Sequence, residues 1–305
     1  MGILFTKKSY LLSAMAALVS CILMIVFSDI AVMSAKNGIT LWTSSVLPAM
    51  LPFFICVNFM TGIGLISMLP AGLFPFAMSA LSGYPMGAKV VGDMYRSGTV
   101  DIHETKRLLS YCSTSGPVFM VGAVGVGMLG SQMAGYVIAV SHYAGAILNG
   151  LLYSKVIDGE RVRGKSTDIR IEECDLMDTL TISIFSAFKS MAVILAYIIF
   201  FMFVMDLSES AGIMNVIESE IARSMFKGFV EMTMGCNGLT GPGQSLRVQC
   251  VVASIIISWG GLSILGQSMS MLSGTGISFK YLALTKFTHS TFAGIIAFVI
   301  ANVML

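Results

Sequence analysis

One apolar stretch, residues 74–97, constrains the fold of this chain more than any other. Its sequence is FPFAMSALSGYPMGAKVVGDMYRS, in which Ser82-Gly83-Tyr84-Pro85 separates two apolar arms. Each arm has about a dozen residues, whereas a helix needs about 20 residues to cross a bilayer at a rise of about 1.5 Å per residue. Because Pro85 lacks a backbone N–H and Gly83 has a low helix propensity, one continuous helix is disfavoured. The stretch therefore predicts a re-entrant hairpin, two half-helices that meet at a broken tip.

The composition places this hairpin in a membrane protein. Of the 305 residues, 56% are hydrophobic and only 11% are charged, whereas a soluble domain has about 25% charged residues. We therefore expect an all-α, polytopic integral membrane protein, whose first partner is the lipid bilayer. The formal net charge is only +2, and no dense cluster of basic side chains indicates nucleic-acid binding.

The apolar runs predict seven full spans in addition to two hairpins. The spans are residues 10–27, 46–68, 108–129, 133–153, 181–205, 249–271 and 281–303. The first run follows Lys7-Lys8, as in a signal peptide, but its length and the lack of a clear cleavage site favour an uncleaved anchor. Lys and Arg gather on one side of these spans, which places the N-terminus and the central charged loop on the cytoplasmic side.

These elements divide the chain into four predicted parts. Residues 1–45 form an N-terminal membrane anchor and an extracytoplasmic segment, 46–155 a first transmembrane repeat with a hairpin at 70–98, 156–178 a charged cytoplasmic loop, and 179–305 a second repeat with a hairpin at 226–248. Each repeat has the order span, hairpin, span, span, and the two repeats enter the membrane from opposite sides. This order predicts an inverted repeat, an arrangement typical of transporters.

Four sequence runs resemble a known family. They are LSGYPMGAK at 81–89, STSGPVFMVGAVGVGML at 113–129, GPGQSLRVQ at 241–249 and SWGGLSILGQ at 258–267. They resemble the YlbJ family of sporulation integral membrane proteins, which is related to the nucleoside-recognition Gate-domain proteins, and the resemblance covers residues 48–298. It implies a role in late spore formation, in which dipicolinic acid moves from the mother cell toward the forespore. It also implies a location in the outer forespore membrane.

The first hairpin contains a predicted substrate-binding cluster. Lys89 and Asp93 are four residues apart, so on a helix they share one face and can form an ion pair. An ionisable side chain near the bilayer centre costs about 2.5–3.5 kcal/mol to insert, so it is rarely there without a role. Lys89 either contacts the substrate or pairs with Asp93 only to stabilise the hairpin; a further alternative is that Asp93 and Arg96 lie at the wet inner surface. At the tip, hydroxyls and free N–H groups can bind an anion, or the segment is only a tight turn with an interfacial tyrosine. The tip residues are Ser82, Gly83, Tyr84 and Pro85.

A second polar cluster lies in the second hairpin region. Its members are Glu231, Asn237, Gln244, Arg247 and Gln249. Arg247 can bind a carboxylate through two parallel hydrogen bonds, or it can pair with Glu231. A dicarboxylate such as dipicolinate suits one cation from each hairpin, with Lys89 at one end and Arg247 at the other. A small anionic substrate is therefore the predicted ligand of both clusters.

Two further groups are predicted near the substrate path. The first group, just before Gly116-Pro117, either lines the path or satisfies the carbonyls that the proline leaves free. It consists of Ser113, Thr114 and Ser115. The second group, His142 and His289, occurs at similar points of the two halves. These histidines can relay protons, or they form hydrogen-bonded contacts between helices.

No motif indicates an enzyme. The chain has no H-E-x-x-H, no G-x-S-x-G, no phosphate-binding loop and no acidic cluster for calcium, so we expect no catalytic residue and no cofactor. The six cysteines lack the spacing of a metal or redox site, and we expect neither a metal nor a disulfide. Two alternatives to an anion transporter or channel stay open: a non-transporting membrane assembly factor and a nucleoside-type transporter. Other sporulation membrane proteins and further copies of this chain are the protein partners considered.

Overall fold

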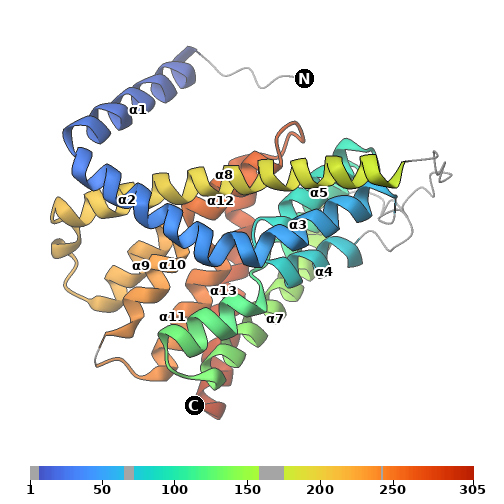
Figure 1. Ribbon diagram of the computed structural model, residues 1–305. Helices are drawn as coiled ribbons and strands as arrows, with labels where there is room; N and C mark the ends of the chain where they lie inside the picture. Colours follow the sequence, from blue (N-terminus) through green and yellow to red (C-terminus); the bar gives the residue numbers. More distant parts are fainter. Residues whose placement is uncertain (1–6, 65–71, 158–174, 242) are drawn as a thin grey trace.

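The computed structural model describes residues 7–64, 72–157, 175–241 and 243–305, and in these ranges the chain forms helices and no strands (Figure 1). This confirms the predicted all-α membrane fold. The first half contains α1 (Lys7–Val26), α2 (Ser28–Leu41), η1 (Trp42–Val46), α3 (Leu47–Gly62), α4 (Leu73–Ser82), α5 (Met86–Arg96), α6 (Ile102–Tyr111), η3 (Val118–Met128) and α7 (Gln132–Val156). The second half contains α8 (Leu176–Ser210), η4 (Ile213–Val216), α9 (Glu220–Val230), α10 (Met232–Asn237), η5 (Gly238–Thr240), α11 (Leu246–Trp259), α12 (Gly261–Met271) and α13 (Phe279–Met304). Most of the predicted loop at 156–178 lies outside the described residues.

The number of full spans is smaller than predicted. Four helical segments are long and apolar enough to cross a membrane: Gln132–Val156, Leu176–Ser210, Leu246–Met271 and Phe279–Met304. Ala14–Val26 and Ser28–Ser44 form a pair bent by 99°, which adds a fifth if the pair is one span. The prediction of seven full spans is therefore corrected to four or five for the described residues. In the predicted span 46–68, α3 has only 16 residues, about 24 Å of helix against a hydrocarbon core of about 30 Å.

The predicted span 108–129 is interrupted between α6 and η3. Residues 113–116 are not helical, in part because Pro117 disfavours the helical conformation of the residue before it. Backbone groups in such a segment need partners from other elements when they are buried. This interruption is therefore a place where side chains from elsewhere in the chain must converge.

The predicted break in the first hairpin is present. α4 ends at Ser82, Gly83 has a φ of +82°, and α5 begins at Met86. A Cβ on Gly83 would lie 2.9 Å from the backbone nitrogen of Gly116. The tip of the first hairpin thus touches the interruption between α6 and η3, and only glycine combines this backbone conformation with so close an approach.

The second hairpin has different boundaries from the predicted 226–248. Its arms are α9 and α10, and the break between them is Glu231, which is extended with φ −139° and ψ 121°. The arms come close together at two glycines, since a Cβ on Gly235 would lie 2.3 Å from the Cα of Gly228. The break thus comes before the Gly-rich sequence on which the prediction depended, because Glu231 itself caps the second arm.

Apart from α1, α2 and the short segments η1, η4 and η5, the helices of both halves follow the same order. The series α3, hairpin α4–α5, interrupted pair α6–η3 and α7 is matched by α8, hairpin α9–α10, interrupted pair α11–α12 and α13. Gly260 and Gly261, each with a φ of +83°, form the interruption between α11 and α12. This order agrees with two repeats; the inversion of one repeat relative to the other stays a prediction.

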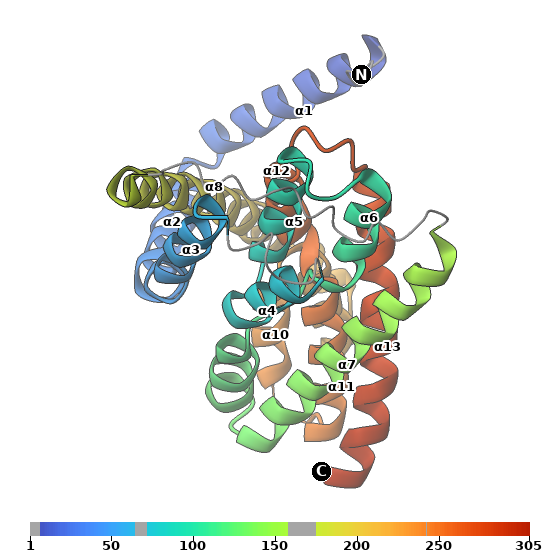
Figure 2. The same ribbon diagram turned by 90° about the vertical axis from the view of Figure 1, so that its right-hand side faces the viewer.

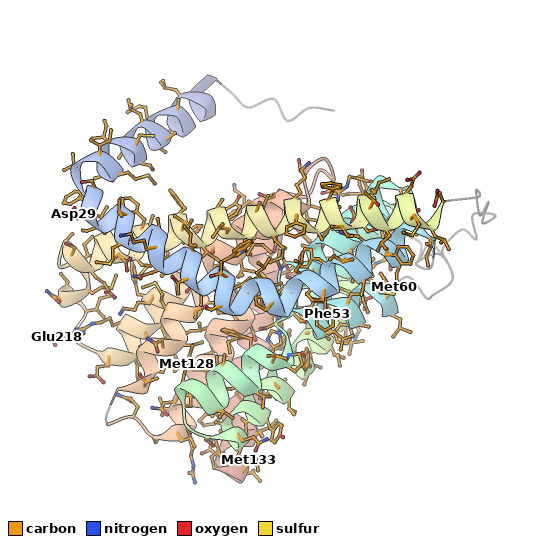
Figure 3. The ribbon with its side chains drawn as sticks, in the orientation of Figure 1. Asp29, Phe53, Met60, Met128, Met133 and Glu218 are labelled. Atoms are coloured by element: carbon orange, nitrogen blue, oxygen red, sulfur yellow. The ribbon has the colours of Figure 1, made fainter. Side chains whose placement is uncertain are left out.

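The helices form two groups. α7, α11 and α13 pack together with η3 on α7 (Figure 2), and α8 packs against α2 and α3 and lies across this bundle (Figure 1). Buried apolar side chains form one cluster that includes α3, α5, α6 and α12 and another that includes η3, α7 and α11. Many exposed side chains are also apolar, among them Phe53 on α3 (Figure 3), as expected for a surface that faces lipid.

The N-terminal region differs from the rest of the molecule. α1, which corresponds to the predicted anchor, projects from the body and meets α2 at a bend of 99° (Figure 1). Asp29 lies in the first turn of α2 (Figure 3). Together, α2 and η1 make up most of the segment predicted to be extracytoplasmic. Here Trp42 Nε1 donates a hydrogen bond to the Met191 carbonyl oxygen on α8 at 3.1 Å. Residues 29–45 are therefore an ordered helical layer against α8.

Candidate functional site

A buried lysine connects several interrupted segments. Lys286, on α13, is only 2% exposed. Its Nζ donates hydrogen bonds to the Tyr84 hydroxyl and to the Ser113 carbonyl oxygen, the second at 3.0 Å. The same Nζ lies 4.2 Å from the centre of the Tyr84 ring, within the range of a cation–π contact. The lysine thus joins α13 to the tip of the first hairpin and to the segment after α6.

Tyr84 extends this connection to a fourth element. Its hydroxyl donates to the Ile257 carbonyl oxygen at 3.2 Å. Ile257 lies in the last turn of α11, which ends where Gly260 adopts a left-handed conformation, and the last carbonyls of a helix have no partner within it. The Ser113 carbonyl, outside α6, has no helical partner either. Lys286 and Tyr84 therefore satisfy carbonyl groups that the interrupted helices leave open.

Two histidines lie beside this pair of residues. His142, on α7, accepts the Ser115 backbone N–H through Nε2 at 2.9 Å, and its Nδ1 lies 2.8 Å from Ser258 Oγ. His289 Nε2, on α13, lies 2.9 Å from the His142 carbonyl oxygen, and the two imidazole rings are 4.6 Å apart. Both ring nitrogens of His142 are therefore occupied by partners from two interrupted segments.

Tyr143 completes the set. Its hydroxyl lies 3.0 Å from the carbonyl oxygens of Ala80 and Ser115, so it links α7 to the hairpin and to the segment after α6. We call the residues that these contacts bring together the buried polar centre. They are Tyr84, Ser113, Ser115, His142, Tyr143, Ser258, Lys286 and His289.

The charge of the buried polar centre is not balanced by an acidic side chain. Lys89 and Arg107 are also buried, with 7% exposure each, and both have a carboxylate partner: Asp93 at 2.8 Å and Glu104 at 3.3 Å. In the described part of the chain, no carboxylate oxygen lies within 4.0 Å of Lys286 Nζ. A buried charge without a counter-charge is costly, so an anion bound next to Lys286 would supply the counter-charge that the described residues lack.

Lys89 and Asp93 form the predicted ion pair, but this pair is not part of the buried polar centre. Asp93 also pairs with Arg96 at 2.7 Å, and Arg96 donates to the carbonyl oxygens of Met271 and Ser273. The Lys89–Asp93 pair lines a cavity of about 320 Å³ between α3, α5 and α8. The other polar residues of this cavity are Asn58, Thr61, Thr179, Ser183 and Ser186.

Three other predicted residues lie next to the buried polar centre. Thr114 Oγ1 donates to Ser79 Oγ on α4 at 2.9 Å. Gly83 and Pro85 flank Tyr84 at the tip, and Ser82 Oγ is buried without a hydrogen-bond partner among the described residues. The structure thus brings the tip of the first hairpin, residues 113–115 and the two histidines together.

The second predicted cluster remains apart from the first. Glu231 accepts the Met234 backbone N–H at 2.8 Å, and Gln249 donates to the Leu239 carbonyl oxygen at 2.8 Å. Asn237 and Arg247 are exposed and Gln244 is half-buried, and no ion pair joins Arg247 to Glu231 within the described ranges. α11, which carries Arg247, packs on α7, α9, α10 and α13, whereas α5, which carries Lys89, packs on α4, α6 and α12. The two cations therefore belong to different packing environments.

Three members of the buried polar centre were not predicted from the sequence: Tyr143, Ser258 and Lys286. One signal identifies Lys286: an ionisable residue inside the predicted span 281–303, three positions before His289 and therefore on the same helix face. No comparable signal marks Tyr143 or Ser258, because their contacts depend on the approach of distant segments. Among the described residues, no group of three or more His, Cys, Asp or Glu side chains is arranged to hold a metal ion.

The chain has a curated relative whose similarity covers most of its length. It is 24% identical over 307 residues to the sporulation integral membrane protein YlbJ of Bacillus subtilis (strain 168), which corresponds to 86% of this chain and 75% of the relative. No protein-family model matches the chain, and no solved structure matches it. The identity and its coverage support the YlbJ family that the sequence motifs indicate. The relation to Gate-domain proteins stays a prediction.

Proposed function

We propose that this chain, as a member of the YlbJ family, is a multi-pass membrane protein of sporulation that moves a small organic anion across the membrane. Its relative is named as a sporulation protein, and dipicolinic acid, moved from the mother cell toward the forespore, is the first candidate substrate. The outer forespore membrane is the proposed location. The segments 46–155 and 179–305 are the proposed repeats between which the anion passes.

The convergence of interrupted helices on one polar centre carries this proposal. The tip of α4–α5, the segment between α6 and η3 and the end of α11 all contribute to the hydrogen bonds around Lys286 and His142. Polar groups and non-helical backbone are costly inside a bilayer unless they line a cavity or serve a site. Discontinuous helices that meet in this way form the binding sites of many secondary transporters.

The Lys89–Asp93 cavity supports the same proposal. It has a volume of about 320 Å³, near the lower limit of ligand-binding pockets, which is about 300 Å³. Its lining combines an ion pair with hydroxyl and amide side chains, in a protein whose surface is largely apolar. We propose that this cavity is a step on the substrate path and that Lys89 contacts the anion there.

Uptake into liposomes tests the proposed function. Purified protein is reconstituted, and uptake of labelled dipicolinate is compared with uptake into protein-free vesicles, with uridine and succinate as other solutes. We expect uptake of dipicolinate above the protein-free level. The variant Tyr84→Ala, which removes a side chain of the buried polar centre, should reduce uptake strongly. Val299→Ala, on the exposed surface of α13, is the matched control and should transport like the wild type.

Two results would contradict the proposal. Uptake of uridine without uptake of any anion would assign the protein to nucleoside-type transport. Absence of uptake of every solute, together with recovery of a stable membrane-protein partner from sporulating cells, would favour the assembly factor.

A further inference from the structure

We propose that Lys286 binds one carboxylate group of the transported solute within the buried polar centre. This inference rests on the proposed function and deepens it, since it names the residue that holds the anion and the chemical group that is recognised. Lys286 lies outside every sequence motif from which a binding site is predicted above.

The groups that face Lys286 leave its charge uncompensated. They are the Tyr84 hydroxyl from the first hairpin, the Ser113 carbonyl from the segment after α6, and the two histidines, His142 from α7 and His289 from α13. None of these groups is acidic. Lys89 and Arg107 show that this protein elsewhere places a carboxylate beside a buried cation. At Lys286 no carboxylate of the described residues takes that position, and we propose that the ligand provides it.

The hydrogen bonds of Lys286 also leave one of its N–H donors without an acceptor among the described residues. An ammonium group has three N–H donors, and two are used by Tyr84 and Ser113. Within the described ranges the third donor has no acceptor. A carboxylate oxygen can accept this third N–H, while the Tyr84 hydroxyl, already next to Nζ, can donate to the same carboxylate in place of Ile257. One carboxylate would then receive a charged and a neutral hydrogen bond.

Two unpartnered hydroxyls occur on the same elements. Ser82 Oγ, two residues before Tyr84, and Ser141 Oγ, next to His142, are buried and have no hydrogen-bond partner in the described part of the chain. Ser141 is 0% exposed. Buried polar groups in folded proteins are nearly always paired, so these elements carry unsatisfied donors in addition to the third N–H of Lys286.

The competing explanation is that Lys286 only holds the interrupted segments together. Its two hydrogen bonds satisfy Tyr84 and Ser113, and that role would need no ligand. The two explanations differ in whether the charge of Lys286 is needed for ligand binding. If Lys286 is only structural, replacing it together with its partner Tyr84 should leave anion binding intact. If Lys286 binds the anion, binding should be lost even when the partner is replaced too.

Direct binding to the purified, detergent-solubilised full-length protein separates these explanations. The probes are benzoate, which has one carboxylate, and benzamide, its uncharged counterpart of nearly the same shape. We expect the wild type to bind benzoate and not benzamide. Lys286→Gln should weaken benzoate binding by about 10- to 100-fold, because it removes a hydrogen bond from a charged donor. Lys286→Arg, which keeps the charge, should retain part of the affinity, and dipicolinate should compete with benzoate for the wild-type site.

If Lys286→Gln fails to fold, the double variant Lys286→Met with Tyr84→Phe provides the test. It removes both members of the hydrogen bond, so that neither is left without the other. A stable double variant that binds benzoate as the wild type does would overturn the inference, and so would a wild type that binds benzamide as well as benzoate. A wild type that binds no carboxylate would overturn it too. A wild type that binds benzoate through Lys286 yet moves no anion into liposomes would support this inference and contradict the proposed function.

Discussion

Lys89 and Lys286 are buried to a similar degree, but they obtain their partners in different ways. Lys89 pairs with Asp93 on the same helix, four residues away, at 2.8 Å. Lys286 has partners from other segments, Tyr84 and Ser113, and neither of them is an acid. The first lysine is neutralised within α5. The second lies in a centre built from four elements, where no carboxylate of the described residues comes within 4.0 Å of its Nζ.

On the substrate path that we propose, this difference separates two roles. A paired lysine beside an open cavity can contact a passing anion at little cost, because its own counter-charge stays in place. An unpaired lysine in a closed centre gains most when an anion arrives, since the ligand provides the missing counter-charge. We therefore expect changes at Lys286 to affect anion binding more than changes at Lys89.

The largest effect is a loss of stability expected at Gly87, because this glycine fixes the position of α5 and therefore of Lys89. Gly87 holds α5, and with it Lys89, directly against the segment after α6: a Cβ there would lie 1.5 Å from the Cys112 carbonyl oxygen. Gly87→Ala forces these backbones apart, and we expect a loss of several kcal/mol of stability and little folded protein. Abundance in membranes and gel filtration in detergent measure this.

Gly122→Ala is the matched control for this substitution. Gly122 lies in helical η3, and a Cβ there has no atom within 4 Å. This variant should reach wild-type abundance. A Gly87→Ala protein with normal abundance and transport would contradict the close packing of α5 and with it the placement of Lys89.

Structural features that depend only on residues close together in the chain could be predicted from the sequence. The break at Gly83 and Pro85 and the pairing of Lys89 with Asp93 both follow from local chain geometry, and both are present. The span count was too high because apolar composition does not show where a helix is interrupted: the run 108–129 is apolar throughout its second part but breaks before Pro117. The break at Glu231 was missed because a helix N-cap inside an apolar region resembles any other acidic residue.

The buried polar centre was only partly predictable for a related reason. Tyr84, Ser113 and the two histidines stood out because polar residues in apolar segments are expensive. Their common contact, Lys286, was not identified, because it is 202 positions from Tyr84 and 173 from Ser113 in the sequence. Contacts over such separations depend on how whole helices pack, and a single sequence does not contain that information in readable form.

An intermediate effect is expected at His142, which lies in the centre with Lys286 and is separate from the Lys89 cavity. His142→Ala leaves the buried Ser115 N–H and Ser258 Oγ without their partner, which costs about 1–3 kcal/mol. A lower temperature of thermal unfolding should show this. The exposed His103 provides the control, since His103→Ala should change stability by less than about 0.5 kcal/mol. Equal stability of the two variants would contradict the structural contact of His142.

The proton-relay proposal for His142 and His289 has a separate test. A relay predicts that anion uptake responds to an imposed pH gradient and that His289→Gln loses this response. His289→Gln keeps a hydrogen-bond donor for the His142 carbonyl oxygen, so it should fold. If the variant responds to the gradient as the wild type does, the histidines are contacts between helices and nothing more.

A smaller effect is expected for Lys89→Gln. Asp93 keeps its 2.7 Å contact with Arg96 after this change and is 28% exposed, so the loss of stability should be only about 1 kcal/mol. Uptake should fall, but less than in Lys286→Gln, because Asp93 already neutralises Lys89. The double variant Lys89→Gln with Asp93→Asn removes the pair as a unit. It should stay transport-defective; full transport in a stable double variant would reduce Lys89 to a structural partner of Asp93.

The smallest effect is expected for Arg247→Gln, which tests whether the second hairpin region supplies a cation for a dicarboxylate. Arg247 is exposed in the first turn of α11 and has no carboxylate partner in the described ranges. Its replacement should therefore change stability by less than about 0.5 kcal/mol. For the same reason the affinity for dipicolinate should change by no more than about twofold. Benzoate provides the internal control, because it has no second carboxylate for Arg247 to hold. If Arg247→Gln weakens dipicolinate binding by about tenfold and leaves benzoate binding unchanged, the two cations cooperate on one ligand, and the substrate path must bring the α11 end toward the first hairpin during transport.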